Sequence, residues 1–116
     1  MKIDKSNIND KLLRIAIDGD LDASSAIQVD NIIQAAFKES RYHILVDCAL
    51  LDYISSAGLG VFISHLDDFQ RNGGSFVFFN MKPTVYNVFE LLGLHDIFLI
   101  VNNESAALDL LLNTSH

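Results

Sequence analysis

The chain has 116 residues, half of which are hydrophobic, and its 15 acidic and 8 basic residues give a formal net charge of −7. This length suits one compact domain over residues 1–116, while the negative charge disfavours binding to nucleic acid or to an anionic membrane surface. No apolar run approaches the ~18 residues of a membrane span, the first ten residues lack a signal-peptide core, and the single cysteine fits a reducing compartment, so we expect a cytoplasmic protein without membrane insertion.

The first half of the chain is predicted to contain two strands, a helix and a third strand. Residues 2–5 form a candidate short strand, and residues 12–18 alternate apolar and polar side chains, as a strand with one buried face does. After a polar break, apolar residues at helical spacing predict a helix over residues 24–38. Residues 43–48 are nearly all apolar, which is typical of a central strand covered on both faces.

The second half alternates helices and strands. The predicted elements are a helix over residues 57–71, a strand over 75–80, a helix over 83–92, a strand over 97–101 and a closing helix over 104–113. The complete order, β-β-α-β-α-β-α-β-α, predicts an α/β fold in which a mixed sheet of four to five strands packs against about four helices.

Residues suited to catalysis or metal binding are sparse. The four histidines share no metal-ligand spacing with one another or with Cys48; they are His43, His65, His95 and His116. The small residues at 56–60 lack both the spacing and the lysine of a phosphate-binding loop. We therefore expect no catalytic residues, no metal and no cofactor, and we interpret Cys48 as a small core residue.

Four carboxylates follow predicted strands or end them: Asp20, Asp22, Asp47 and Asp52. Open α/β sheets place their sites at the carboxyl ends of strands, which makes these residues candidates for a binding site. Aspartate also caps helices and solubilises loops. Both interpretations stay open for Asp22, and the second is favoured for Asp52.

The stretch L-D-Y-I-S-S-A-G-L-G-V-F, residues 51–62, places two serines and two glycines where the second helix begins. Ser55 or Ser56 is suited to cap this helix. Gly58 and Gly60 each cost roughly 1 kcal/mol relative to alanine inside a helix, so their presence indicates close approach by the neighbouring sheet or by a partner.

The motifs G-D-L-D at residues 19–22 and S-A-G-L-G-V at residues 56–61, with Gly73-Gly74 before the next strand, resemble the STAS domain, and more narrowly the bacterial anti-sigma factor antagonists. The resemblance covers essentially the whole chain. It implies a binding module, with no enzymatic activity, that captures an anti-sigma factor serine kinase and so frees a sigma factor. It also implies that the kinase phosphorylates Ser56, with Ser55 as the alternative acceptor, and that a PP2C-type phosphatase removes the phosphate.

Two positions depart from the family pattern. Ser55 stands where an aspartate usually precedes the acceptor, and Ala57 stands where serine or threonine commonly follows it.

Two further functions stay open: a STAS subunit of a lipid or anion transport complex without a phosphorylation cycle, and a small-molecule sensor. The predicted partner-binding surface joins two loops and consists of Asp20, Asp22, Ser24, Ser55, Ser56, Gly58 and Leu59.

Overall fold

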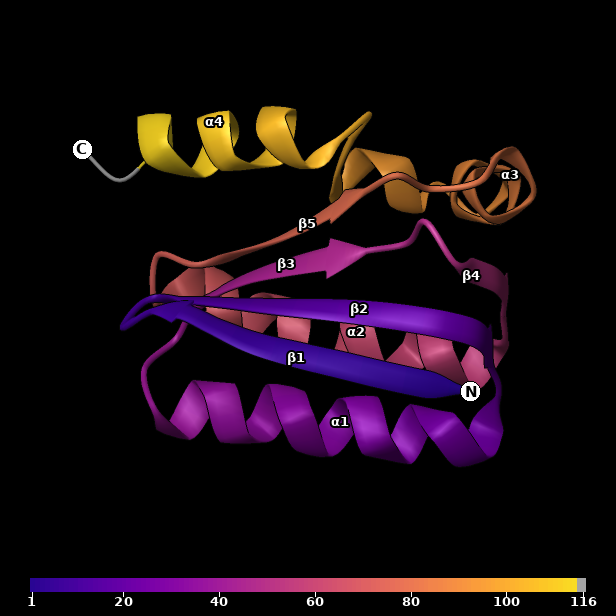
Figure 1. Ribbon diagram of the computed structural model, residues 1–116, viewed down its shortest axis with the longest axis horizontal. Helices are drawn as coiled ribbons and strands as arrows, with labels where there is room; N and C mark the ends of the chain where they lie inside the picture. Colours follow the sequence, from indigo (N-terminus) through magenta and orange to yellow (C-terminus); the bar gives the residue numbers. More distant parts are fainter. Residues whose placement is uncertain (115–116) are drawn as a thin grey trace.

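The computed structural model describes residues 1–114 and confirms the α/β fold, with helices on both faces of a mixed sheet (Figure 1). The described strands are β1 (Lys2–Asn9), β2 (Leu12–Leu21), β3 (His43–Asp47), β4 (Leu51–Ile54), β5 (Ser75–Phe79) and β6 (Leu99–Val101). The described helices are α1 (Ala23–Lys38), α2 (Ser56–Arg71), α3 (Pro83–Leu91), the 3-10 turn η1 (Leu94–Asp96) and α4 (Glu104–Thr114).

The long strand β2 organises the sheet. It pairs antiparallel with β1 along one edge, while on its other side its first half pairs in parallel with β3. Its second half pairs in parallel with β4, so that β3 and β4 follow one another along the same strand. The main order is β1-β2-β3-β5-β6, and β4 pairs only with β2. The end of β2 therefore meets the end of β4.

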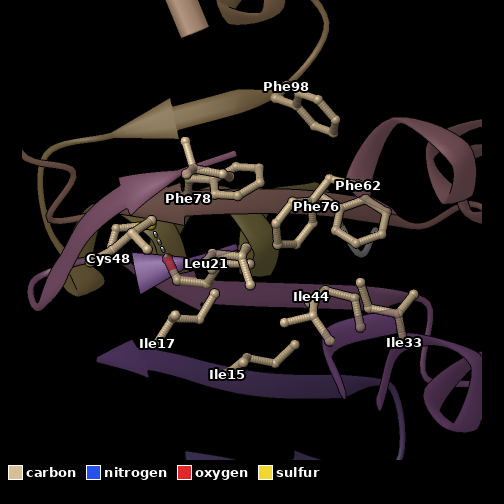
Figure 2. Close-up of a cluster of buried hydrophobic side chains, with 14 of the residues drawn as sticks. Ile15, Ile17, Leu21, Ile33, Ile44, Cys48, Phe62, Phe76, Phe78 and Phe98 are labelled. Carbon is tan, nitrogen blue, oxygen red and sulfur yellow. Dashed lines mark hydrogen bonds between the residues drawn. The ribbon is translucent and has the colours of Figure 1, made fainter. Parts of the chain in front are cut away.

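Alternation along the central strands sends side chains into two cores. One core lies toward α1 and α2 and contains Ile44, Val46, Phe76 and Phe78. The other lies toward α4 and contains Leu45, Val77 and Phe79. Figure 2 shows the first core, where the ring centroid of Phe62 lies 6.0 Å from that of Phe76 and 5.0 Å from that of Phe78. This packing fixes α2 against the sheet.

An ion-pair network connects the sheet to α4 on the opposite face. The Nη2 atom of Arg14 lies 2.9 Å from Oδ2 of Asp47, and its Nε atom lies 2.9 Å from Oε2 of Glu104. The guanidinium carbon also lies 5.6 Å from the centroid of the Phe79 ring. One side chain of β2 thus contacts β3, β5 and the first turn of α4.

The structure differs from the sequence prediction mainly at the ends of elements. β4 is an additional strand, so the sheet has six strands among the described residues where four to five were expected. β1 continues to Asn9, and β2 continues to Leu21 through the segment predicted as a polar break. α1 begins one residue early, at Ala23. The additional strand matters for function, because it positions the start of α2.

Candidate functional site

The pairing of β2 with β4 brings the two predicted loops together. Leu21 is the register partner of Ile54, and the backbone N–H of Ser55 donates to the carbonyl oxygen of Leu21 at 2.9 Å. Asp22 and Ser55 are the residues that follow these two strands, so they lie side by side. Because each is also a helix cap, α1 and α2 begin at the same place on the molecule.

Asp22 caps α1 through a reciprocal capping box. Its Oδ1 accepts from the N–H of Ser25 at 3.0 Å and from the hydroxyl of Ser24 at 2.8 Å. The Oγ of Ser25 in turn accepts from the N–H of Asp22 at 2.9 Å. Asp22 therefore has a structural role as the cap of α1, which is one of the two interpretations of this residue.

The same contacts keep Asp22 charged. The backbone N–H of Ser25, together with the hydroxyls of Ser24 and Ser25, lowers the pKa of this carboxyl from 3.8 to about 2. Hydrogen bonds donated to a carboxylate favour its ionised form, which is the physical cause of this shift. Asp22 is exposed and so presents a permanent negative charge at neutral pH beside the start of α2.

Ser55 and Ser56 have different tasks, although they are adjacent. Ser55 is the N-cap of α2, with extended backbone angles (φ −83°, ψ 169°), and its Oγ accepts from the N–H of Gly58 at 3.1 Å. Ser56 is the first helical residue and is exposed. Within residues 1–114 the Ser56 hydroxyl has no hydrogen-bond partner, because the capping position is already taken by Ser55. Of the two serines, Ser56 is the one with a free hydroxyl.

Two residues of the predicted surface are buried. A Cβ atom on Gly58 would lie 2.9 Å from Cγ of Leu21 and 3.1 Å from Cγ1 of Ile54, so the sheet is what approaches this glycine. Leu59 is 5% exposed and belongs to the core. The prediction that Gly58 and Leu59 line a partner-binding surface is therefore wrong, because both face the sheet. Asp20, Asp22, Ser24 and Ser56 are exposed, and Ser55 is half-buried.

Gly60 differs from Gly58, and the exposure of two isoleucines was not predicted. A Cβ atom on Gly60 would meet nothing within 4 Å. Ile63 of α2 is 44% exposed, and Ile27 of α1 is 64% exposed. The exposure of Ile27 could have been anticipated, because Ala26 and Val29 lie on the buried face of α1 and Ile27 falls outside that helical stripe.

The other candidate residues have structural contacts. Asp47 binds Arg14, and Asp52 forms an ion pair with Lys82 at the start of α3. Cys48 is buried, and burial strongly raises the pKa of its thiol. The two ion pairs and the burial of the thiol give Asp47, Asp52 and Cys48 structural roles in the fold.

The histidines do not gather at one place. Nε2 of His65 lies 2.6 Å from Oδ1 of Asp30 and so joins α1 to α2, while Nδ1 of His43 lies 3.1 Å from Oγ of Ser75. His116 lies outside the described residues. Across the part of the chain that the structure describes, no group of three or more histidine, cysteine or acidic side chains is placed to hold a metal ion.

Among the described residues, none of the helices combines enough length with enough apolar character to cross a bilayer.

Comparison with known proteins identifies the family. The STAS domain family model matches residues 5–107. BtrV of Bordetella bronchiseptica, which carries the name of an anti-sigma factor antagonist, is 32% identical over 107 residues, covering 92% of this chain and 91% of that protein.

Solved structures share the fold. The anti-sigma factor antagonist SpoIIAA in its unphosphorylated form has a TM-score of 0.76 at 20% identity, covering 95% of this chain and 97% of that one. The phosphorylated form of SpoIIAA from Bacillus has a TM-score of 0.75 at 22% identity, covering 95% of this chain and 99% of that one. The chain belongs to the STAS domain family.

Proposed function

We propose that this protein is a cytoplasmic anti-sigma factor antagonist that binds an anti-sigma factor serine kinase and loses this binding when the kinase phosphorylates Ser56. In this reaction the Ser56 Oγ attacks the γ-phosphorus of the kinase's ATP, the hydroxyl proton is released and ADP leaves. A PP2C-type phosphatase then hydrolyses the phosphoserine and restores binding. The protein itself performs no catalysis.

The observation that carries this proposal is the structural difference between the two serines: Ser55 caps α2, and Ser56 does not. Ser55 supplies the hydrogen bond that the helix start requires, and Ser56 projects an unengaged hydroxyl from the first helical position. The Ser55 hydroxyl is half-buried and bonded to the N–H of Gly58, whereas the Ser56 hydroxyl is exposed and open to a kinase. The acceptor is therefore Ser56 and not Ser55.

Local electrostatics explain how a phosphate on Ser56 switches binding without unfolding the helix. A phosphate adds about −1.5 to −2 charges near neutral pH. At the first position of α2 it faces the unpaired N–H groups and the positive end of the helix dipole, both of which favour an anion. The partner instead meets a bulkier surface with more negative charge, beside the ionised Asp22. Each loss of about 1.4 kcal/mol in binding free energy lowers the affinity tenfold.

The comparisons support a switch of this kind. The relative BtrV bears the antagonist name and matches this chain along nearly its whole length. The unphosphorylated and phosphorylated forms of SpoIIAA match the fold of this chain almost equally, with TM-scores of 0.76 and 0.75. Phosphorylated SpoIIAA thus keeps the fold, and we expect the same of this protein.

The test is a phosphorylation and binding assay with purified anti-sigma factor kinases of the source organism. Wild type, Ser55→Ala and Ser56→Ala are incubated with kinase and ATP, and the labelled residue is located by mass spectrometry. We expect labelling of wild type and Ser55→Ala at Ser56, and none in Ser56→Ala. In a separate binding measurement, Ser56→Ala should retain its affinity for the kinase, and Ser56→Asp should lose at least tenfold.

Other outcomes would point elsewhere. Full labelling of Ser56→Ala would mean that the acceptor has been assigned to the wrong residue. A wild-type chain that binds no kinase, but forms a defined complex with the ATPase and permease of a transporter, would favour the transport-subunit function over the proposed one.

A further inference from the structure

A pocket of about 410 Å³ opens at the carboxyl ends of β5 and β6, and the residues that line it have no part in the proposed function. They come from the segment that leaves β5 and starts α3, and from the end of β6. Open α/β sheets bind ligands outside the carboxyl ends of their strands, and ligand pockets have volumes of about 300–1,000 Å³. The position and the size of this pocket are therefore those of a site for a small molecule.

The apolar part of the lining is held in place by the rest of the fold. Met81 and Ile100 are half-buried and pack against the core toward α1 and α2, while Val101 is half-buried and packs against the core toward α4. Asn80, which has a left-handed backbone (φ 56°), donates its N–H to the carbonyl oxygen of Asn102 at 3.3 Å. The ends of the two strands that frame the pocket are thus bonded to each other, so the pocket exists before any ligand arrives.

Three polar side chains line the same pocket and have no hydrogen-bond partner among residues 1–114. They are the phenol of Tyr86 and the side-chain amides of Asn87 and Asn102. An asparagine amide offers both N–H donors and a carbonyl acceptor, so it pairs with a carboxamide through two hydrogen bonds. The ring of Tyr86 adds an aromatic surface against which a planar group packs. The polar lining therefore suits a ligand that carries a carboxamide.

The pocket has no charged residue in its lining and no free cation beside it. No lysine or arginine follows Lys82 in the sequence, and Lys82 itself forms an ion pair with Asp52. Glu104, two residues after Asn102, is bound to Arg14. A phosphate or carboxylate on a ligand would lose part of its hydration here without meeting an opposite charge, which is unfavourable. The pocket therefore favours an uncharged ligand.

We propose that this pocket binds a small uncharged molecule with a carboxamide on a planar ring. The ring lies against Tyr86 and the apolar lining, and the carboxamide pairs with the amides of Asn87 and Asn102. Neither Ser55 nor Ser56 lines the pocket, so the inference goes beyond the proposed function and does not depend on it.

The test is a titration of the isotope-labelled full chain with nicotinamide and with benzamide, followed by NMR. Both compounds are uncharged aromatic carboxamides. We expect each to shift the side-chain amide signals of Asn87 and Asn102 along one saturable curve. Nicotinate and benzoate have the same rings and nearly the same size but carry a negative charge, and they should bind at least tenfold more weakly.

Variants locate the binding site. Asn87→Ala and Asn102→Ala should each weaken binding of both carboxamides at least fivefold. Asn31→Ala makes the same change at an exposed position of α1 and should leave binding unchanged. Melting temperatures of the three variants, measured in parallel, check that each keeps its fold.

Three results would overturn the inference. The first is that neither carboxamide gives saturable shifts at the pocket. The second is that nicotinate and benzoate bind as tightly as the carboxamides. The third is that folded Asn87→Ala and Asn102→Ala bind both carboxamides as tightly as Asn31→Ala does. None of these results bears on phosphorylation of Ser56.

Discussion

Gly58→Ala tests how α2 is seated on the sheet. The new Cβ would lie 2.9 Å from Cγ and 3.0 Å from Cδ2 of Leu21, and 3.1 Å from Cγ1 of Ile54. Leu21 and Ile54 are 0% and 4% exposed, and Cγ of Leu21 is the branch point of its side chain, so both neighbours are confined by the core around them. Overpacking of this kind costs about 1–3 kcal/mol, against a helix-propensity gain of at most about 1 kcal/mol.

Contacts this short place the overpacking cost in the upper part of that range, about 2–3 kcal/mol, so the expected net loss is about 1–2 kcal/mol in the free energy of unfolding. For a chain of 116 residues, an unfolding entropy of about 2.1 cal/mol/K per residue converts this loss into a fall of roughly 4–8 °C in melting temperature. Thermal unfolding followed by circular dichroism measures it, with Gly60→Ala as the partner variant that should move the other way. A Gly58→Ala protein as stable as wild type would refute the assignment of Gly58 to the helix–sheet contact.

The remaining predictions concern the caps and the cysteine. Ser55→Ala should cost about 1 kcal/mol in urea unfolding and Ser56→Ala close to nothing, and equal effects would contradict the assignment of the cap. Because its pKa falls from 3.8 to about 2 on folding, charged Asp22 stabilises the fold above about pH 4, and this stability disappears as the pH drops from 4 toward 2. Asp22→Asn, which keeps a capping oxygen, should reduce the loss of stability between pH 4 and pH 2. If the pH dependence of stability in this range is unchanged in the variant, groups other than Asp22 control it. Cys48, buried with a raised pKa, should resist thiol reagents in the native protein and react on unfolding, and rapid native labelling would contradict its burial.

The sequence was most informative where burial follows a regular period. Residues 12–18 and 43–48 show the spacing that a packed strand requires, and both became strands of the sheet. β4 escaped prediction because Leu51 and Ile54 are buried while the two residues between them are exposed, which is not strand alternation. Its strand conformation comes from pairing with the end of β2, whose register partners lie more than thirty residues earlier in the chain. Local pattern carries no information on such a contact.

The choice between the two serines shows a similar limit. Either hydroxyl suits a helix cap, and the sequence leaves both open. The backbone decides, because the N–H of Ser55 is bonded to Leu21 of β2, which holds Ser55 in the extended conformation of a cap and starts the helix at Ser56. The exposed Ile63 shows a related limit: in the sequence an apolar residue beside a core stripe looks like part of that stripe until the orientation of the helix is known.

The serine at position 55 also bears on how the proposed switch operates. Family members usually carry aspartate there, and aspartate and serine are both good caps, so the exchange preserves the start of α2 and removes one negative charge next to the acceptor. In this chain the ionised Asp22, the cap of α1, is brought alongside the start of α2 by the β2–β4 pairing. Before phosphorylation the surface beside Ser56 is therefore less negative than it would be with an aspartate at position 55. The phosphate accordingly changes the charge of this surface by a larger factor than it would in a chain with that aspartate. Ser55→Asp should accordingly keep the melting temperature within a few degrees of wild type while narrowing the difference in kinase affinity between the unphosphorylated and phosphorylated proteins. An unchanged affinity ratio, measured by calorimetry on both forms, would show that the bulk of the phosphate and not its charge drives release.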